Sequence, residues 1–358
     1  MNLNEFLNEY REKVNKAINE FLVEKEEIAT KEYRKDNAEF YRNLREFMLR
    51  GGKRLRPIAV ILAYKSVKED DVEEENIIKA STCVEFLHNS TLIHDDIIDE
   101  DSLRRGGPTF HVLYEKVFSY LPKDRAKLYG LAFGIMGGDE LFNLGFEALL
   151  TSGFKGDELY EALGYYIEAY REVVNGELLD LVMSVSDYER LLIDDYLLMV
   201  RLKTAALFEK SFLIGLALAK APEDIKNIFS QYAISVAEAF QIRDDILGLY
   251  GEEEEIGKPV GSDIREGKAT ILVILAFKYL PHKEKQRLKE ILLKREVTKE
   301  DVYYVRELLK KHGILNRAEE LSESLIERAK ETISSLEINE DYKELLLALA
   351  EFVVKRKY

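Results

Sequence analysis

The sequence predicts an all-α fold, and three of its features indicate this. Apolar residues recur at i, i+3 and i+4 along nearly all of the 358 residues, which is the spacing of a helix that buries one face. No segment alternates apolar and polar residues as a half-buried strand does, and only six prolines are present to interrupt helices. Connecting segments are short, and no Gly-, Ser- or Pro-rich linker divides the chain. We therefore expect a single large helical-bundle domain that spans residues 1–358.

Amphipathic spacing predicts six helices in the first part of the chain, the third of which opens at Pro57 because proline fits a first helical turn. They cover Asn4–Lys25, Lys31–Leu49, Pro57–Ser66, Glu73–Glu100, Thr109–Tyr120 and Arg125–Ser152. Farther on, Thr204–Ala221 is apolar nearly all round, as expected of a helix that other helices enclose. The later helices cover Asp157–Met183, Arg190–Lys220, Pro222–Tyr250, Lys268–Leu280, Lys283–Leu293, Lys299–His312, Arg317–Ser334 and Glu340–Lys355.

Composition excludes several classes of function. The formal net charge is −15 and no basic stripe exists, so a nucleic-acid partner is not expected. The same charge is unsuited to a polyanionic substrate unless metal ions invert the local field. The single cysteine, Cys83, lies in an apolar helical run, which predicts a core residue in a reducing, cytoplasmic setting. The charged start and the lack of a spanning apolar run predict neither a signal peptide nor stable membrane insertion. Abundant Glu, Lys and Ile fit a thermophile.

The stretch Thr91–Gly106 is the first candidate site. An apolar helical run ends in aspartates and is followed at once by Arg104 and Arg105, whose forked guanidinium groups suit phosphate. Carboxylates at a helix C-terminus are unfavourable unless a cation offsets them. Asp95 and Asp99 are i and i+4 on one helical face, and such a pair can hold magnesium that keeps water and substrate phosphate as its other ligands. Asp96 points about 100° away, as a supporting carboxylate would. The alternative is a solvated acidic helix end followed by a basic turn.

A basic loop, Gly51–Pro57, precedes this stretch. Lys53, Arg54 and Arg56 stand between a helix end and a helix start, where a phosphate can bind, although basic surface loops are common. His88 lies seven residues before Asp95 and therefore on the same helical face. We expect His88 to donate a hydrogen bond to phosphate; a buried, satisfied histidine is the alternative.

A second stretch downstream repeats this arrangement. Asp244 and Asp245 end another apolar helical run, a glycine-rich loop with Lys258 follows, and Lys268 lies at the expected start of the next helix. Upstream, Lys203 begins an otherwise apolar segment, where a lysine either snorkels or faces a polar cavity. Two acidic helix ends that face each other across one cavity could bind a cluster of magnesium ions with a diphosphate between them. Two such stretches are far less probable by chance than a single one, so the pair favours a functional site over solvated helix ends.

The motifs together resemble those of one family. The motifs are GGKRLRP, HNSTLIHDDIIDEDSLRRG, LKT, FQIRDDILG and GKPVGSDIREGKAT. Their order and spacing resemble those of the trans-isoprenyl diphosphate synthases (polyprenyl synthetases), and archaeal geranylgeranyl diphosphate synthases are the type they resemble most. The resemblance implies an all-helical isoprenoid synthase fold around a deep central cavity, a homodimer, and dependence on three magnesium ions. It implies head-to-tail condensation of isopentenyl diphosphate with an allylic diphosphate.

The same resemblance assigns expected roles to individual residues. The expected metal site consists of Asp95, Asp96 and Asp99 for the first motif, Asp244 for the second, and Asp263 acting through water. The expected allylic diphosphate site consists of Arg104, Lys203, Lys258 and Lys268, with Thr204 and Gln241 beside them. The expected isopentenyl diphosphate site consists of Lys53, Arg56, His88 and Arg105. The candidate catalytic residues among these are Asp95, Asp99, Asp244, Arg104, Lys203 and Lys258.

This chain departs from the family pattern at Gly248, where many relatives carry a third aspartate, and at Glu177, where relatives often carry glutamine. Product length in the family depends on bulk just before the first motif. Ser90 and Thr91 are small there, which predicts geranylgeranyl diphosphate or a somewhat longer product. A terpene cyclase of the same fold, or a regulatory subunit of a heteromeric synthase, are the alternatives.

Overall fold

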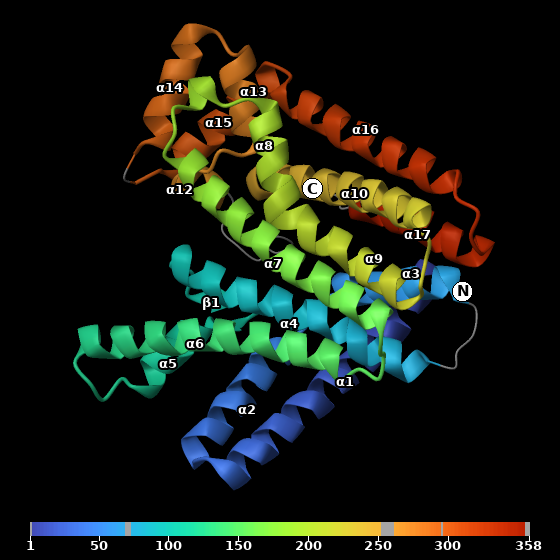
Figure 1. The fold of residues 1–358 in the computed structure, drawn as a ribbon. Coiled ribbons are helices and arrows are strands. Elements are labelled where there is room, and N and C mark those ends of the chain that lie inside the picture. The colour runs from blue at the N-terminus through green and yellow to red at the C-terminus, as the bar shows by residue number, and fades with distance from the viewer. Residues whose placement is uncertain (1, 69–72, 252–260, 295, 355–358) are drawn as a thin grey trace. The chain divides into compact units, whose positions relative to one another are not determined.

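The computed structural model describes residues 2–68, 73–251, 261–294 and 296–354 (Figure 1). These residues fold almost entirely into helices, so the predicted all-α class is confirmed. The chain divides into two compact units. Unit 1 comprises Met1–Ile167 with Ser211–Ala221, and unit 2 comprises Glu168–Lys210 with Pro222–Tyr358. The expectation of a single domain around a central cavity stays a prediction.

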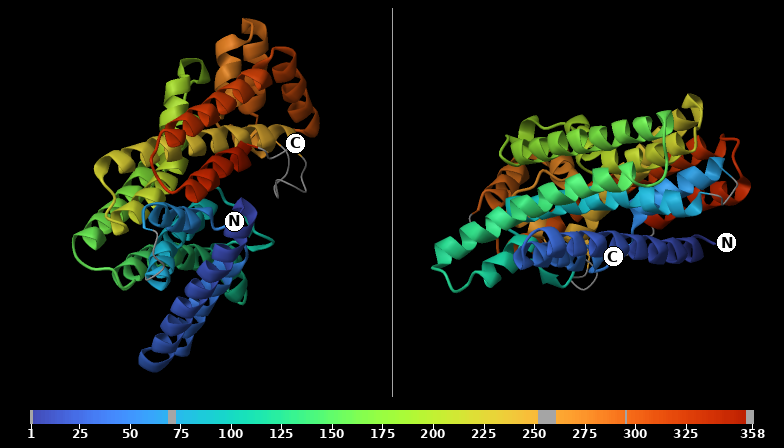
Figure 2. Two further views of the ribbon diagram at one scale, coloured as in Figure 1. Left: turned by 90° about the vertical axis from the view of Figure 1, so that its right-hand side faces the viewer. Right: turned by 60° about the horizontal axis from the view of Figure 1, so that its bottom comes forward.

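Unit 1 is built on one buried helix, α4. Its elements are α1 (Leu3–Glu32), α2 (Lys35–Leu49), α3 (Leu55–Val67), α4 (Glu74–Ile98), β1 (Leu103–Arg104), β2 (Gly107–Pro108), α5 (Phe110–Val117), α6 (Lys123–Leu150), the first turns of α7 (Asp157–Ser184) and the later turns of α9 (Ala206–Leu218). Helix α4 packs against α1, α3 and α6, and its middle turns, including Cys83, are fully buried. Helices α1 and α2 lie side by side as an antiparallel pair (Figure 2).

Unit 2 is organised around α10. Its elements are the rest of α7, η1 (Tyr188–Arg190), α8 (Ile193–Val200), η2 (Arg201–Ala205), the start of α9 (Ala206–Leu218), α10 (Glu223–Tyr250), α12 (Ser262–Glu266), α13 (Ile271–Tyr279), α14 (His282–Leu292), α15 (Lys299–Lys311), α16 (Ile314–Ser334) and α17 (Glu340–Val354). Helix α10 packs against α16, α17 and η2. In the described residues, no helix is long and apolar enough to cross a bilayer.

Most predicted helices are present, and the departures have local causes. Helix α1 runs on to Glu32, beyond the predicted end at Lys25, because its polar last turns continue one uninterrupted helix. The predicted helix Arg190–Lys220 is wrong at its start: a 3-10 turn comes first and α8 begins only at Ile193. Lys268 was expected at a helix start, but α13 begins at Ile271 after an N-cap by Thr270.

Two short elements near the candidate sites were not predicted from the spacing of apolar residues. Strands β1 and β2 pair antiparallel, and the turn between them has positive φ at Arg105 (50°) and Gly106 (74°), the backbone of a tight two-residue hairpin. Strands of two residues are too short to show alternation. The segment η2 is a π-helical turn between α8 and α9; such turns keep the helical spacing of apolar residues and frequently occur at functional sites.

Candidate active site

The first acidic stretch ends α4 in unit 1. Asp99 is the C-cap residue, and its N–H donates a hydrogen bond to the carbonyl of Asp95 at 2.8 Å. Both side chains are partly exposed. The two residues therefore lie about one helical turn apart on the same face of α4, as predicted from the i, i+4 spacing.

Asp96 has a different surrounding. Its side chain is fully buried, and its Oδ1 accepts a hydrogen bond from Nε of Arg104 at 2.5 Å and forms an ion pair with Nη2 of Arg104 at 2.5 Å. Burial raises the pKa of Asp96 to about 6, although Arg104 opposes the shift. The hairpin thus returns Arg104 to the helix end and supplies the cation that the clustered aspartates require. The contact with Arg104 is consistent with the expectation that Asp96 is a supporting carboxylate. A metal contact of Asp96 and a diphosphate contact of Arg104 stay predictions.

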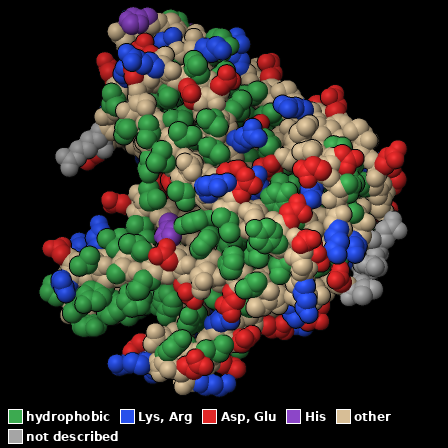
Figure 3. Space-filling view, in the orientation of Figure 1, with side chains coloured by type: hydrophobic (Ala, Val, Ile, Leu, Met, Phe, Trp, Pro, Cys, Tyr) green, Lys and Arg blue, Asp and Glu red, His purple; other side chains and the backbone are tan. Residues whose placement is uncertain are grey.

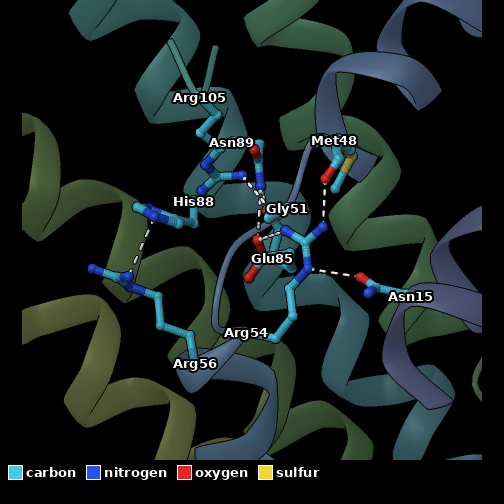
Figure 4. Close-up of polar contacts among 9 residues, drawn as sticks. All are labelled: Asn15, Met48, Gly51, Arg54, Arg56, Glu85, His88, Asn89 and Arg105. Carbon is cyan, nitrogen blue, oxygen red and sulfur yellow. Dashed lines mark hydrogen bonds and ion pairs between the residues drawn. The ribbon is translucent and has the colours of Figure 1, made fainter. Parts of the chain in front are cut away.

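The expected isopentenyl diphosphate residues come together beside α4 (Figure 4). Nη1 of Arg56 lies 3.3 Å from Nε2 of His88, and Nη1 of Arg105 donates to the carbonyl of Gly51 at 3.0 Å. Lys53 is exposed in the same loop. Burial and the neighbouring guanidinium groups of Arg56 and Arg105 lower the pKa of His88 well below its usual value. The ring is therefore neutral at pH 7, and one of its nitrogens can donate to an anion.

Arg54 departs from the phosphate-binding loop that the sequence suggested. Its side chain is buried and points away from Arg56, toward Glu85, Asn15 and the carbonyl of Met48 (Figure 4). Of the three loop cations, Arg54 is therefore turned away from any ligand at the loop surface. Sequence reasoning missed Glu85 and Asn15; a lone carboxylate inside the apolar run of α4 was the one signal for Glu85.

In unit 2, the π-turn η2 presents Lys203 to α7. Nζ of Lys203 lies 2.6 Å from Oδ2 of Asp180 and 2.8 Å from Oε2 of Glu177. The backbone of Lys203 contacts Gly176 so closely that a Cβ there would collide with it. Lys203 thus faces a polar site rather than snorkelling, and both Glu177 and Asp180 hold its ammonium group.

A chain of hydrogen bonds connects η2 to the second acidic stretch on α10. Thr204 Oγ1 donates to Gln241 Oε1 at 2.9 Å, and Gln241 Nε2 donates to Asp245 Oδ1 at 3.0 Å. Asp245 also accepts from the hydroxyl of Tyr196 at 2.7 Å and from the backbone N–H of Ile271 at 3.1 Å. Burial, reinforced by the nearby charge of Asp263, raises the pKa of Asp245 to about 7. Tyr196 was not predicted, because its partner is 49 residues away.

Asp244 precedes this buried aspartate and is partly exposed, as are Asp263 and Lys268. A Cβ at Gly248 would lie 2.8 Å from Oδ2 of Asp263, so the glycine that replaces a third aspartate makes room for the carboxylate of Asp263. Lys258 lies outside the described residues.

The carboxylates fit magnesium by the chemistry of their donors. Carboxylate oxygens are what this cation prefers, and magnesium usually takes few protein ligands and keeps water or substrate phosphate for the rest. In the described ranges, no group of three or more His, Cys, Asp or Glu side chains is arranged to hold a metal ion alone. A metal at Asp95 and Asp99, or at Asp244 and Asp263, would therefore take its remaining ligands from water or from a bound substrate.

The residues expected to set product length lie one turn before Asp95. Ser90 is fully buried, and its hydroxyl has no hydrogen-bond partner among the described residues. Thr91 is partly exposed and donates to the carbonyl of His88 at 2.8 Å.

The comparisons with known proteins agree on a family. The polyprenyl synthetase family matches residues 37–309. The geranylgeranyl diphosphate synthase of Saccharolobus solfataricus is 36% identical over 310 residues, 86% of this chain and 87% of that protein. The geranylfarnesyl diphosphate synthase of Aeropyrum pernix is 34% identical over 313 residues, 86% of this chain and 91% of that protein.

A solved structure agrees as well. The geranylgeranyl pyrophosphate synthase of Corynebacterium glutamicum, complexed with isoprenyl diphosphate and magnesium, matches with a TM-score of 0.90 and 26% identity over 100% of both chains. The chain therefore belongs to the polyprenyl synthetase family and is a prenyltransferase of its geranylgeranyl diphosphate synthase-like type.

Proposed function

We propose that this enzyme condenses isopentenyl diphosphate head-to-tail with an allylic diphosphate. The observation that carries the proposal is the pair of aspartate-ended helices, α4 and α10, each accompanied by cations, in a chain of this family. Both acidic stretches keep the carboxylates that a metal-bridged diphosphate needs. The cations beside α4 are suited to the diphosphate of the second substrate.

The residues have distinct roles in the proposed reaction. Asp95, Asp99 and Asp244, with Asp263 through water, would hold three magnesium ions, which when bound stabilise the charge of the departing diphosphate. Arg104, Lys203, Lys258 and Lys268 would hold the same diphosphate. Lys53, Arg56, His88 and Arg105 would hold isopentenyl diphosphate.

The proposed bond changes balance without a dedicated protein base. The allylic carbon–oxygen bond breaks and its electron pair leaves with the diphosphate. The double bond of isopentenyl diphosphate then attacks the allylic carbon, and a carbon–carbon bond forms. The departing diphosphate takes the proton that is lost from the resulting cation, which restores a double bond.

Incubation with labelled isopentenyl diphosphate and an allylic primer tests the proposal. We expect extended prenyl diphosphates, a complete loss of product when EDTA removes divalent metal, and recovery when magnesium is added back. Release of a hydrocarbon would identify a cyclase instead. Absence of extension with every primer, in the presence of magnesium, would favour a regulatory subunit.

We propose geranylgeranyl diphosphate or a somewhat longer compound as the product. Relatives named for both product lengths have nearly equal identity to this chain. Ser90 supports the proposal, because it is small and buried at the position where a bulky side chain would limit growth of the product.

Ser90→Phe should shorten the main product by one isoprenoid unit or more, because the ring would fill space that the growing chain needs. Ser90→Ala keeps the side chain small and should leave the product unchanged. Product chromatography measures both. An unchanged distribution in a folded Ser90→Phe enzyme would show that Ser90 does not line the path of the chain.

A further inference from the structure

Arg54 lies in the loop of the proposed isopentenyl diphosphate site, but its side chain serves the protein interior. It is 2% exposed. Its Nε donates to Asn15 Oδ1 at 2.8 Å, Nη1 to Glu85 Oε1 at 2.5 Å, and Nη2 to the carbonyl of Met48 at 2.5 Å. One guanidinium thereby joins the loop to α1, α4 and the end of α2.

The backbone of this loop needs such an anchor. Arg54 has φ of 55°, a left-handed conformation that costs a non-glycine residue free energy. Such conformations persist at functional sites where the surroundings determine them. Gly51 and Gly52 also have positive φ, and a Cβ on Gly52 would lie 3.3 Å from Nη1 of Arg54 and 3.4 Å from Nη1 of Arg105.

Glu85 places a buried negative charge beneath the cations. It is 3% exposed, and it accepts from Asn89 Nδ2 at 3.1 Å as well as from Arg54. Glu85 stands three residues before His88 on α4, so the two side chains share one helical face. The carboxylate also attracts Arg56 and Arg105, two cations that would otherwise repel each other before a diphosphate binds.

We propose that Arg54, Glu85 and Asn15 are positioning residues for the isopentenyl diphosphate site. They touch no substrate; they fix the loop so that Arg56, with Lys53 on the same loop, stands ready beside His88 and Arg105. The inference rests on the proposed function. Preorganised donors bind an anion more tightly than mobile ones because less ordering is required on binding. Arg54 cannot be exchanged for lysine without loss, since an ammonium group cannot make the same forked set of bonds.

The test compares KM values for the two substrates in purified full-length enzyme. In Glu85→Gln and Arg54→Lys, we expect KM for isopentenyl diphosphate to rise about tenfold or more, with KM for the allylic diphosphate within about twofold of the original. Asn15→Ala should produce a smaller shift of the same kind. Calorimetric binding of isopentenyl diphosphate without primer should weaken in parallel.

Glu74→Gln is the control. Glu74 connects α4 to α1, as the Arg54 network does, and also to α3, through Tyr10, Lys13 and Lys65. Glu74→Gln should therefore lower stability without changing a contact of the loop. If Glu74→Gln raises KM for isopentenyl diphosphate as much as Glu85→Gln does, or if both substrates' KM values rise together, the inference is wrong. If Glu85→Gln does not fold, Arg54→Lys and Asn15→Ala decide. Inactivity of the original enzyme would instead refute the proposed function.

Discussion

His88 is a neutral ring held among arginines. Four guanidinium groups, those of Arg56, Arg105, Arg104 and Arg54, add to burial in lowering its pKa well below its usual value. In the unfolded chain the same ring takes up a proton near pH 6.5. Below that pH the unfolded state therefore binds more protons than the folded state, and acid favours unfolding.

This sign leads to a pH prediction for stability. As pH falls below 6.5, His88 should reduce the free energy of unfolding by up to about 1.4 kcal/mol per pH unit. The contribution is fully present above pH 6.5. His88→Gln should remove this part of the pH slope, which urea titrations between pH 7 and 5 measure. Equal slopes in His88→Gln and the original protein would show that His88 is not held neutral.

At the scale of single residues, the sequence predicted which side chains carry charge but not which partner each one takes. Asp95 and Asp99 could be placed on one helical face because their spacing alone determines it. Arg54 and Arg104 could not, because each is paired with a carboxylate, Glu85 or Asp96, through folding of the chain on itself. Local spacing contains no information about such a partner.

At the scale of elements, helices were predictable and the short elements that position the site were not. Apolar spacing is a property of many residues and survives small errors at the ends. The hairpin of β1 and β2 depends on two residues with positive φ, and η2 depends on one extra residue per turn. Neither element changes the spacing of apolar residues in the sequence. Each nevertheless positions a site residue, since the hairpin brings Arg104 to Asp96 and η2 brings Lys203 to Asp180.

The hydrogen-bond chain from Tyr196 to Thr204 shows how such elements act together. Tyr196→Phe removes one of the hydrogen-bond donors to the buried carboxylate of Asp245. The loss should lower the free energy of unfolding by about 1–3 kcal/mol. Because Asp245 also holds Gln241, and Gln241 holds Thr204, we expect KM for the allylic diphosphate to rise severalfold, while KM for isopentenyl diphosphate stays unchanged. Steady-state kinetics with each substrate varied in turn measures this difference.

Tyr232→Phe is a matched control for that experiment. Its ring is fully buried in unit 2, and its hydroxyl donates to the carbonyl of Leu346 at 2.6 Å. It should lose comparable stability and keep both KM values. If Tyr232→Phe and Tyr196→Phe change the kinetics equally, the chain of hydrogen bonds has no special part in holding the substrate.

For the whole molecule, composition and periodicity were enough for the all-α class, since a chain that is helical almost throughout shows the pattern almost everywhere. The division into two compact units was not foreseen, because no change of composition marks it. It passes through α7 and α9, after Ile167 and Lys210, and a continuous helical pattern contains no sign of such a division.

Helix α6 has an exposed apolar stripe, and this stripe would suit the interface of the expected homodimer. Figure 3 shows hydrophobic side chains gathered over this helix. Leu128, Ile135 and Met136 are 54%, 51% and 49% exposed on one stripe of it, and exposed apolar patches mark protein–protein contacts.

Ile135→Glu should dissociate a homodimer formed through this stripe. In a twofold interface the substitution appears twice, and each buried, unpaired carboxylate costs several kcal/mol, so the dissociation constant should rise by at least about 100-fold. Sedimentation equilibrium measures it. Leu293→Glu alters an apolar residue that is even more exposed, at 68%, just after the end of α14, and should leave the mass unchanged. A monomeric original protein, or a dimer that survives Ile135→Glu, would mean that α6 does not form the interface and that its apolar stripe meets another partner.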